Sequence, residues 1–121
     1  MSVFLITILC VAFIFYISGM LLKIYPPKKR NYWYGYRTLR SLKNNHTWTE
    51  ANTYAAFISR RVALALAIIG CVLLIALPSN EKIQGTTTIL LVFTSAALIV
   101  VLTEKHLKRM FDKEGKPISN N

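Results

Sequence analysis

The chain has 121 residues, of which 54% are hydrophobic and 17% are charged, and its formal net charge is +10. Such a composition excludes most soluble folds, in which about a quarter of the residues are charged. It also argues against intrinsic disorder, which requires low hydrophobicity. The apolar residues fall in three blocks with the charges between them, and this pattern predicts an all-α integral membrane protein with three transmembrane helices.

The first apolar block covers residues 3–22 and contains no charge. Twenty such residues are enough for a helix to cross about 30 Å of hydrocarbon. No basic residue precedes the block, and Lys23 follows it with no small-residue cleavage site in between. These features favour a retained span over a cleaved signal peptide.

The second block, residues 62–77, is short for a span, but Arg60 and Arg61 precede it directly. Long arginine side chains near a helix end can reach back to the interface while their stems stay in apolar surroundings. We therefore predict a span over about residues 59–77.

The helix that carries this second span is expected to start near Trp48. Thr47 is followed three residues later by Glu50, which is the spacing of a capping box. Pro78 would end the helix and turn the chain.

The third span is predicted over about residues 84–102, in a helix that continues in polar form to about Met110. The chain is then a single membrane domain, residues 1–121, with a long aromatic and basic loop over 23–58 and a tail over 103–121. Within the tail, Gly115-Lys116-Pro117 and the Asn-rich end suggest a frayed segment.

The basic residues are unevenly distributed between the segments that flank the spans. The loop and its borders hold nine of the fifteen, the tail holds five, the link between the second and third spans holds Lys82 alone, and the N-terminus holds none. The positive-inside rule then predicts the N-terminus outside the cell, with the loop and the tail in the cytoplasm.

The apolar blocks contain no Asp, Glu, Lys, Arg or His, which argues against an ion or proton pathway. Ala63, Ala67, Gly70 and Cys71 form a small-residue face on the second helix. That face fits packing within one subunit and equally fits a homodimer contact. We expect no metal, because His46 and His106 are far apart in the sequence and have no companion ligands at metal spacing. We also expect no cofactor and no catalytic residue, because no nucleotide-binding or hydrolase motif occurs.

Residues 25–57 hold eight of the fourteen aromatic residues, interleaved with lysine and arginine. One interpretation is a membrane anchor, since tryptophan and tyrosine favour the headgroup layer and basic residues favour an anionic leaflet. The other is a binding loop. Gly35 between aromatic residues suggests a turn or a close backbone approach, and the polar residues nearby exceed what an anchor requires. Nucleic acid is not an expected partner, because topology already accounts for the charge.

The ordered elements of this loop are Tyr34-Gly35-Tyr36-Arg37-Thr38, Ser41-Leu42-Lys43-Asn44, Trp48 and Ala51-Asn52. In this order and spacing they resemble the SdpI family of small bacterial membrane proteins, named for an immunity protein against a secreted toxin. The three-span layout is similar as well. This chain corresponds only to the motif-bearing half of that longer protein.

The resemblance implies a non-enzymatic protein of the bacterial cytoplasmic membrane that confers toxin resistance or signals the presence of the toxin. Its expected partners are membrane lipids and either a peptide toxin or a cytoplasmic regulator, with a homodimer as a further expectation. The alternative is a small-molecule or lipid-binding membrane component or transporter subunit. The candidate binding residues are Asn31, Tyr34, Gly35, Tyr36, Arg37, Thr38, Ser41, Lys43, Asn44, Trp48 and Asn52.

Arg37 has two expected roles. Flanked by Tyr34 and Tyr36, it is a donor fork suited to a carboxylate or a phosphate. Alternatively, it binds helix carbonyl groups of its own fold. In both cases Trp33 and Trp48 would seat the loop in the membrane interface.

Overall fold

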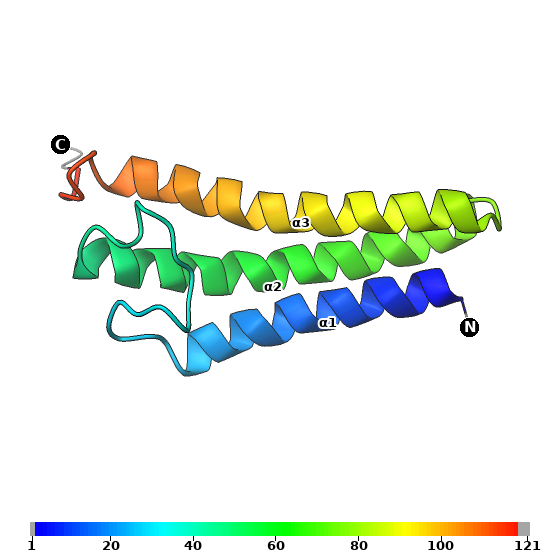
Figure 1. The fold of residues 1–121 in the computed structure, drawn as a ribbon, viewed down its shortest axis with the longest axis horizontal. Helices are drawn as coiled ribbons and strands as arrows, with labels where there is room; N and C mark the ends of the chain where they lie inside the picture. Colours follow the sequence, from blue (N-terminus) through cyan, green and yellow to red (C-terminus); the bar gives the residue numbers. More distant parts are fainter. Residues whose placement is uncertain (1, 119–121) are drawn as a thin grey trace.

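The computed structural model describes residues 2–118, which form three long helices (Figure 1). These are α1 (Val3–Ile24), α2 (Asn45–Ala76) and α3 (Glu81–Met110). Within the described residues the only strand-like pairing is an isolated bridge between Phe111 and Pro117. The all-α prediction is confirmed, and so is the predicted end of the third helix at Met110.

All three helices are long and apolar enough to cross a membrane. With a rise of about 1.5 Å per residue, α2 and α3 exceed the length that a bilayer requires. The excess lies at one end of the bundle, together with residues 25–44 and the tail (Figure 1). We call this the loop end. The other end, formed by the N-terminus and the α2–α3 connection, is the turn end.

The start of α2 differs from the prediction. Asn44, not Thr47, is the N-cap, and its side-chain oxygen accepts a hydrogen bond from the Thr47 backbone amide. Thr47 is the third helical residue, and its hydroxyl oxygen accepts a hydrogen bond from the Asn44 backbone amide, which completes a capping box. The expected pairing of Thr47 with Glu50 is therefore wrong, because a better cap lies three residues upstream.

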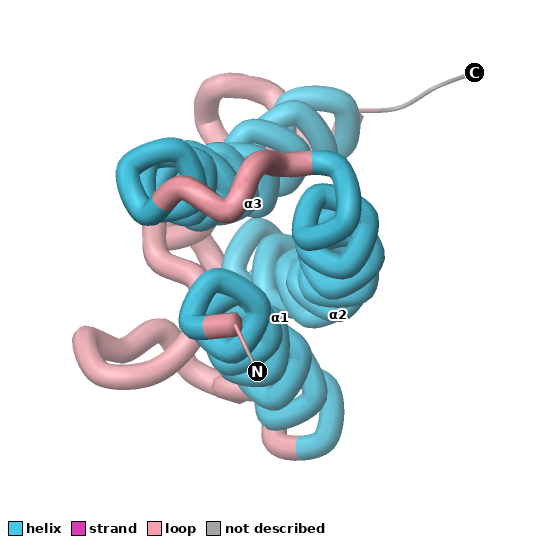
Figure 2. The backbone as a smooth tube through the Cα atoms, turned by 90° about the vertical axis from the view of Figure 1, so that its right-hand side faces the viewer, coloured by secondary structure: helices cyan, strands magenta, loops and turns pink. Residues whose placement is uncertain are grey.

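Packing is centred on α2, which lies against both α1 and α3 (Figure 2). The core within the bilayer-length part is formed by Phe4, Ile8 and Ala12 of α1 with Leu66 of α2. Most other apolar side chains of α1 and α3 face outward, as expected for helices surrounded by lipid.

Glycines set the short distance between α1 and α2. A Cβ atom at Gly70 would lie 2.5 Å from Ile8 Cγ2, and one at Gly19 would lie 2.8 Å from the Ala56 carbonyl oxygen. Ala63 is also buried. The small-residue face therefore serves packing within the subunit at these positions, whereas Cys71 is exposed.

The two arginines at the start of the second span point back toward the loop end. Arg60 Nε donates to the carbonyl oxygen of Ala56, one turn earlier, at 3.1 Å. The guanidinium of Arg61 lies over the ring of Phe57, 5.0 Å from its centroid. Both side chains are thus directed away from the apolar segment that follows, as predicted for snorkelling residues.

The tail does not fray at Gly115 as predicted. Asp112 Oδ1 accepts hydrogen bonds from the backbone amides of Glu114 and Lys116, and the chain turns back on itself. Gly115 is buried, with a φ of 82° that favours glycine. Phe111 packs with Ala51 and other residues of the loop end, so residues 111–118 are part of the fold. The Asn-rich end of the predicted frayed segment lies outside the described residues.

The substitution Gly19→Ala is expected to destabilise the fold by about 1–3 kcal/mol, because the added methyl group meets the Ala56 carbonyl, a backbone atom with little freedom to move. The measurement is thermal unfolding in detergent. The control is Gly85→Ala in α3, where nothing lies within 4 Å; it should be neutral or slightly stabilising. Equal unfolding temperatures for the two variants would contradict the close α1–α2 contact.

Candidate binding site in the motif loop

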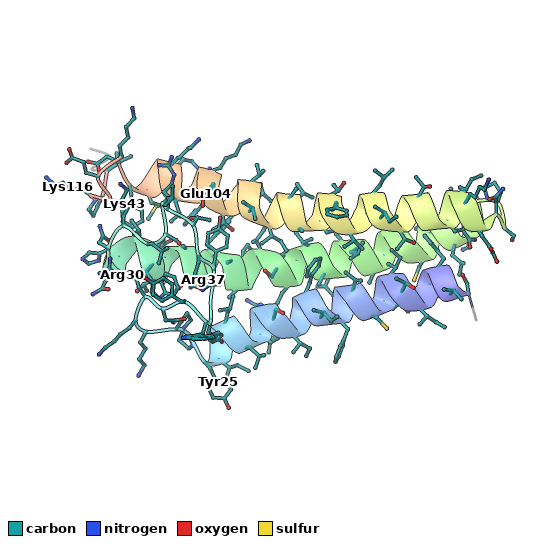
Figure 3. The ribbon with its side chains drawn as sticks, viewed as in Figure 1. Tyr25, Arg30, Arg37, Lys43, Glu104 and Lys116 are labelled. Atoms are coloured by element: carbon teal, nitrogen blue, oxygen red, sulfur yellow. The ribbon has the colours of Figure 1, made fainter. Side chains whose placement is uncertain are left out.

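The motif loop, defined as residues 25–44, connects α1 to α2 and covers the loop end of the bundle (Figure 3). It contains no regular secondary structure beyond short turns. Its shape must therefore come from side chains that bond to the backbone.

Asn31 forms the first turn of the motif loop. Its Oδ1 accepts hydrogen bonds from the backbone amides of Trp33 at 2.9 Å and of Tyr34 at 2.7 Å. Its Nδ2 donates to the carbonyl of Lys29. The Tyr34 hydroxyl then donates to the carbonyl of Tyr25 at 2.8 Å, which fastens the turn to the end of α1.

Asn52, on the second turn of α2, holds the middle of the loop. Its Oδ1 accepts from the backbone amide of Tyr36 at 2.6 Å, and its Nδ2 donates to the carbonyls of Tyr36 and Trp48. The side chain is 2% exposed. One carboxamide thus satisfies both backbone polar groups of Tyr36, as a neighbouring strand would.

Gly35 satisfies both conditions that the sequence suggested. Its φ is 109°, a region that favours glycine. A Cβ atom there would also lie 2.7 Å from Asn52 Oδ1 and 2.8 Å from Pro27 Cγ. Trp48 holds Pro27 in this position, since its Nε1 donates a hydrogen bond to the Pro27 carbonyl at 2.6 Å.

Thr38 and Ser41 bond to each other's backbone amide: Ser41 Oγ accepts from the Thr38 amide, and Thr38 Oγ1 accepts from the Ser41 amide. Ser41 is fully buried. Asn44, besides capping α2, donates through Nδ2 to the Gly115 carbonyl at 2.7 Å. The loop, α2 and the tail are joined at this point.

Glu104 of α3 is the acceptor that ties the loop to the third helix. Its Oε1 accepts from the hydroxyl groups of Tyr36 and Thr38, both at 2.7 Å. Its Oε2 lies 3.3 Å from Arg40 Nε. Glu104 and Arg40 were not among the residues predicted from the sequence; the available signal was an acidic residue placed just after the third span in an otherwise basic segment.

Burial of the phenol, and after it the hydrogen bond to Glu104 and the negative charge of that carboxylate, raise the pKa of Tyr36 well above its ordinary value of 10.0. Tyr36 therefore remains a hydrogen-bond donor over the whole physiological range.

A second link between α2 and α3 was also missed. His106 Nε2 and Glu50 Oε1 lie 2.7 Å apart, and the imidazole ring stacks on Tyr54 with ring centroids 4.1 Å apart. Glu50, expected in the capping box, is thus bound across the bundle instead. Within the described residues, no group of three or more potential metal ligands occurs.

Arg37 is exposed, and within residues 2–118 it makes no hydrogen bond or ion pair of its own. The expected bonds from Arg37 to helix carbonyl groups are therefore not made. Arg30 instead binds loop backbone, since its Nη1 contacts the carbonyls of Leu42 and Lys43 at 3.0 and 3.3 Å. The expectation that Trp48 seats the loop in the membrane interface is wrong, because Trp48 is fully buried. Trp33 is 92% exposed, and its position in the interface stays a prediction.

The candidate residues thus divide into two sets. One set has side chains committed to hydrogen bonds within the chain: Asn31, Tyr34, Tyr36, Thr38, Ser41, Asn44, Trp48 and Asn52. In the other set, Arg37 and Lys43 project outward, and Gly35 contributes through its backbone.

A cavity of about 400 Å³ opens between α1 and α3 beneath the motif loop. Its lining combines part of the motif with all three helices: Ser18, Leu21, Leu22, Trp33, Tyr34, Gly35, Tyr36, Ala55, Ser59 and Ile99. We call it the motif groove. Its walls are mainly apolar, and the hydroxyl groups of Ser18 and Ser59 add polar contacts.

Comparison with known proteins gives two matches. Residues 28–103 match the SdpI/YfhL protein family. The uncharacterized protein YfhL of Bacillus subtilis is 38% identical over 99 residues, which cover 82% of this chain and 84% of that protein. No solved structure matches.

Asn52→Ala is expected to destabilise the protein by about 1–3 kcal/mol, since it leaves the buried backbone groups of Tyr36 without partners. Thermal unfolding in detergent measures the loss, and limited proteolysis should show cleavage within 25–44. Asn45→Ala, at the exposed first residue of α2, is the control. A variant as stable and as protease-resistant as this control would exclude the proposed role of Asn52.

Tyr36 should ionise only well above pH 10, and the difference in absorbance at 295 nm between wild type and Tyr36→Phe isolates its titration. The folded-state pKa is raised, so the stabilisation linked to this phenol is complete below pH 10 and is lost as the pH rises further. A difference titration with its midpoint at or below pH 10 would disagree with the buried bond to Glu104.

Proposed function

Because the chain belongs to the SdpI/YfhL protein family, we propose that it is a non-enzymatic membrane protein that binds a peptide toxin in the motif groove. The family is one of membrane proteins of the immunity type. The observation that carries the proposal is the position of the motif aromatic residues. Trp33, Tyr34 and Tyr36 line a cavity that is open between α1 and α3.

The groove has the chemistry that an amphipathic peptide requires. Leu21, Leu22 and Ile99 offer apolar contacts at the depth where the predicted spans end. Ser59 and Ser18 offer hydrogen bonds, which gain strength in apolar surroundings. A peptide that acts on the membrane would reach this groove laterally, from within the bilayer interface.

Arg37 supplies the charge for this interaction. It follows directly on the groove-lining residues 33–36, it is exposed, and its five donors match a carboxylate better than a lysine would. Asn52 and Gly35 hold the backbone on its N-terminal side. The backbone from which Arg37 projects therefore starts from a fixed position, which reduces the backbone entropy lost on binding.

The competing function is the binding of a lipid or small molecule in the same groove, which is favoured by its apolar lining. A cytoplasmic regulator is the third candidate partner, and it would contact the outward side of the loop rather than the groove. The three candidates differ in what lies next to Trp33, a residue that lines the groove and is also 92% exposed.

The test places a photo-crosslinking amino acid, p-benzoylphenylalanine, at position 33 in native bacterial membranes challenged with secreted peptide toxins. We expect a cross-linked peptide, and we expect Ser18→Phe, which fills the groove, to abolish it. Ser79→Phe at the exposed turn end is the matched control. Cross-links to lipid alone would support the competing function, and cross-links to a soluble protein that persist in Ser18→Phe would favour the regulator.

We also propose that the loop end faces the cytoplasm. All basic residues except Lys82 are carried by the loop end or by the helix segments that border it, as the positive-inside rule requires. In a Cys10→Ala, Cys71→Ala background, Ser79→Cys should react with a membrane-impermeant maleimide in intact cells. Lys113→Cys should react only after permeabilisation. The reverse pattern would show that the loop end faces the outside of the cell and would contradict the proposal.

A further inference from the structure

A second cavity of about 310 Å³ lies at the loop end, on residues that the motif groove does not use. Leu39, Arg40, Lys43, Glu104 and Lys113 line it. These residues come from the motif loop, from α3 and from the tail, and Figure 3 shows Lys43 and Glu104 at this end of the bundle. Three cations and one carboxylate thus converge from three segments of the chain.

The carboxylate does not neutralise this cavity. Glu104 accepts hydrogen bonds from Tyr36 and Thr38 and binds Arg40 through Nε only. This ion pair holds the guanidinium of Arg40 beside Glu104, and within residues 2–118 no hydrogen bond joins its two terminal nitrogens to a protein acceptor. The Arg40 side chain is 29% exposed, which leaves these nitrogens accessible to a ligand.

The nearby carboxylates of the tail are engaged elsewhere. Asp112 accepts from the backbone amides of Glu114 and Lys116, and Glu114 lies 3.8 Å from the ammonium of Lys116. Lys113 is therefore left without a carboxylate partner among the described residues, and so is Lys43. After the Arg40–Glu104 pair is counted, the cavity retains two positive charges.

The depth of the cavity indicates its ligand. Glu104 follows the predicted end of the third span by two residues, so the cavity begins where the hydrocarbon ends and the headgroup layer starts. Leu39 at its rim is 89% exposed, which suits contact with an acyl chain. Basic pockets beside transmembrane helices at this depth commonly hold lipid headgroups.

We propose that this cavity, lined by Arg40, Lys43 and Lys113, is a binding site for a phosphate group. Arginine supplies a planar donor fork and the lysines supply point charges, a combination that suits phosphate oxygens. The phosphate belongs either to an anionic phospholipid or to a soluble phosphate ester. The proposal is independent of toxin binding, because the two cavities share no lining residue.

The test is native mass spectrometry of the full chain in detergent micelles with phosphatidylglycerol and phosphatidylcholine at equal concentration, and separately with glycerol 3-phosphate. Wild type should prefer phosphatidylglycerol. Lys43→Gln/Lys113→Gln should reduce that preference about tenfold, since each basic side chain near the headgroup contributes substantially. Lys28→Gln/Lys29→Gln removes the same charge from exposed residues outside the cavity and should change it less than twofold.

Arg40→Lys, which keeps the charge but loses the fork, provides a second variant and should give an intermediate loss. Unfolding temperatures confirm that each variant is folded. Binding of phosphatidylglycerol alone identifies a lipid site, and binding of glycerol 3-phosphate as well identifies a general phosphate site. No preference for the anionic lipid in wild type, or an equal loss in both lysine double variants, would overturn the proposal.

Discussion

The structure of the loop end depends on one carboxamide. Asn52 bonds to the amide and the carbonyl of Tyr36 and so gives an irregular loop the backbone pairing that a sheet would otherwise provide. Gly35 is required because no side chain fits against that carboxamide. With Tyr36 fixed, its hydroxyl reaches Glu104 and connects the loop to α3. The motif is therefore first a set of contacts that shapes the loop.

This arrangement gives the two sides of the loop different properties. Toward the bundle, aromatic side chains and small α2 residues border an apolar groove that opens between α1 and α3. Away from it, Arg40, Lys43 and Lys113 gather around a carboxylate whose charge is already paired. The first side suits a partner that arrives through the membrane, and the second suits an anion at its surface. Both are held by α2, which extends beyond the predicted span.

The sequence predicted the fold well because hydrophobic block length and Pro78 are local signals, and the third helix ends where expected. It predicted the start of α2 less well, since Asn44 and Thr47 both suit a cap; in the structure the capping box between them and the contact of Asn44 with Gly115 favour Asn44. Glu104 and His106 were missed because their partners lie more than 50 residues away. Trp48 was mistaken for an interface residue for a related reason, because its partner, Pro27, lies 21 residues away across the loop.

The central claim is that the motif contains two kinds of residue, one that builds the loop and one that contacts the partner. The most direct test measures unfolding temperature and toxin protection together for variants of the outward-facing residues. Arg37→Lys and Trp33→Ala should keep the unfolding temperature of wild type and lose protection of toxin-sensitive cells. Full protection by both variants would contradict the claim and would leave the motif as a structural element and membrane anchor alone.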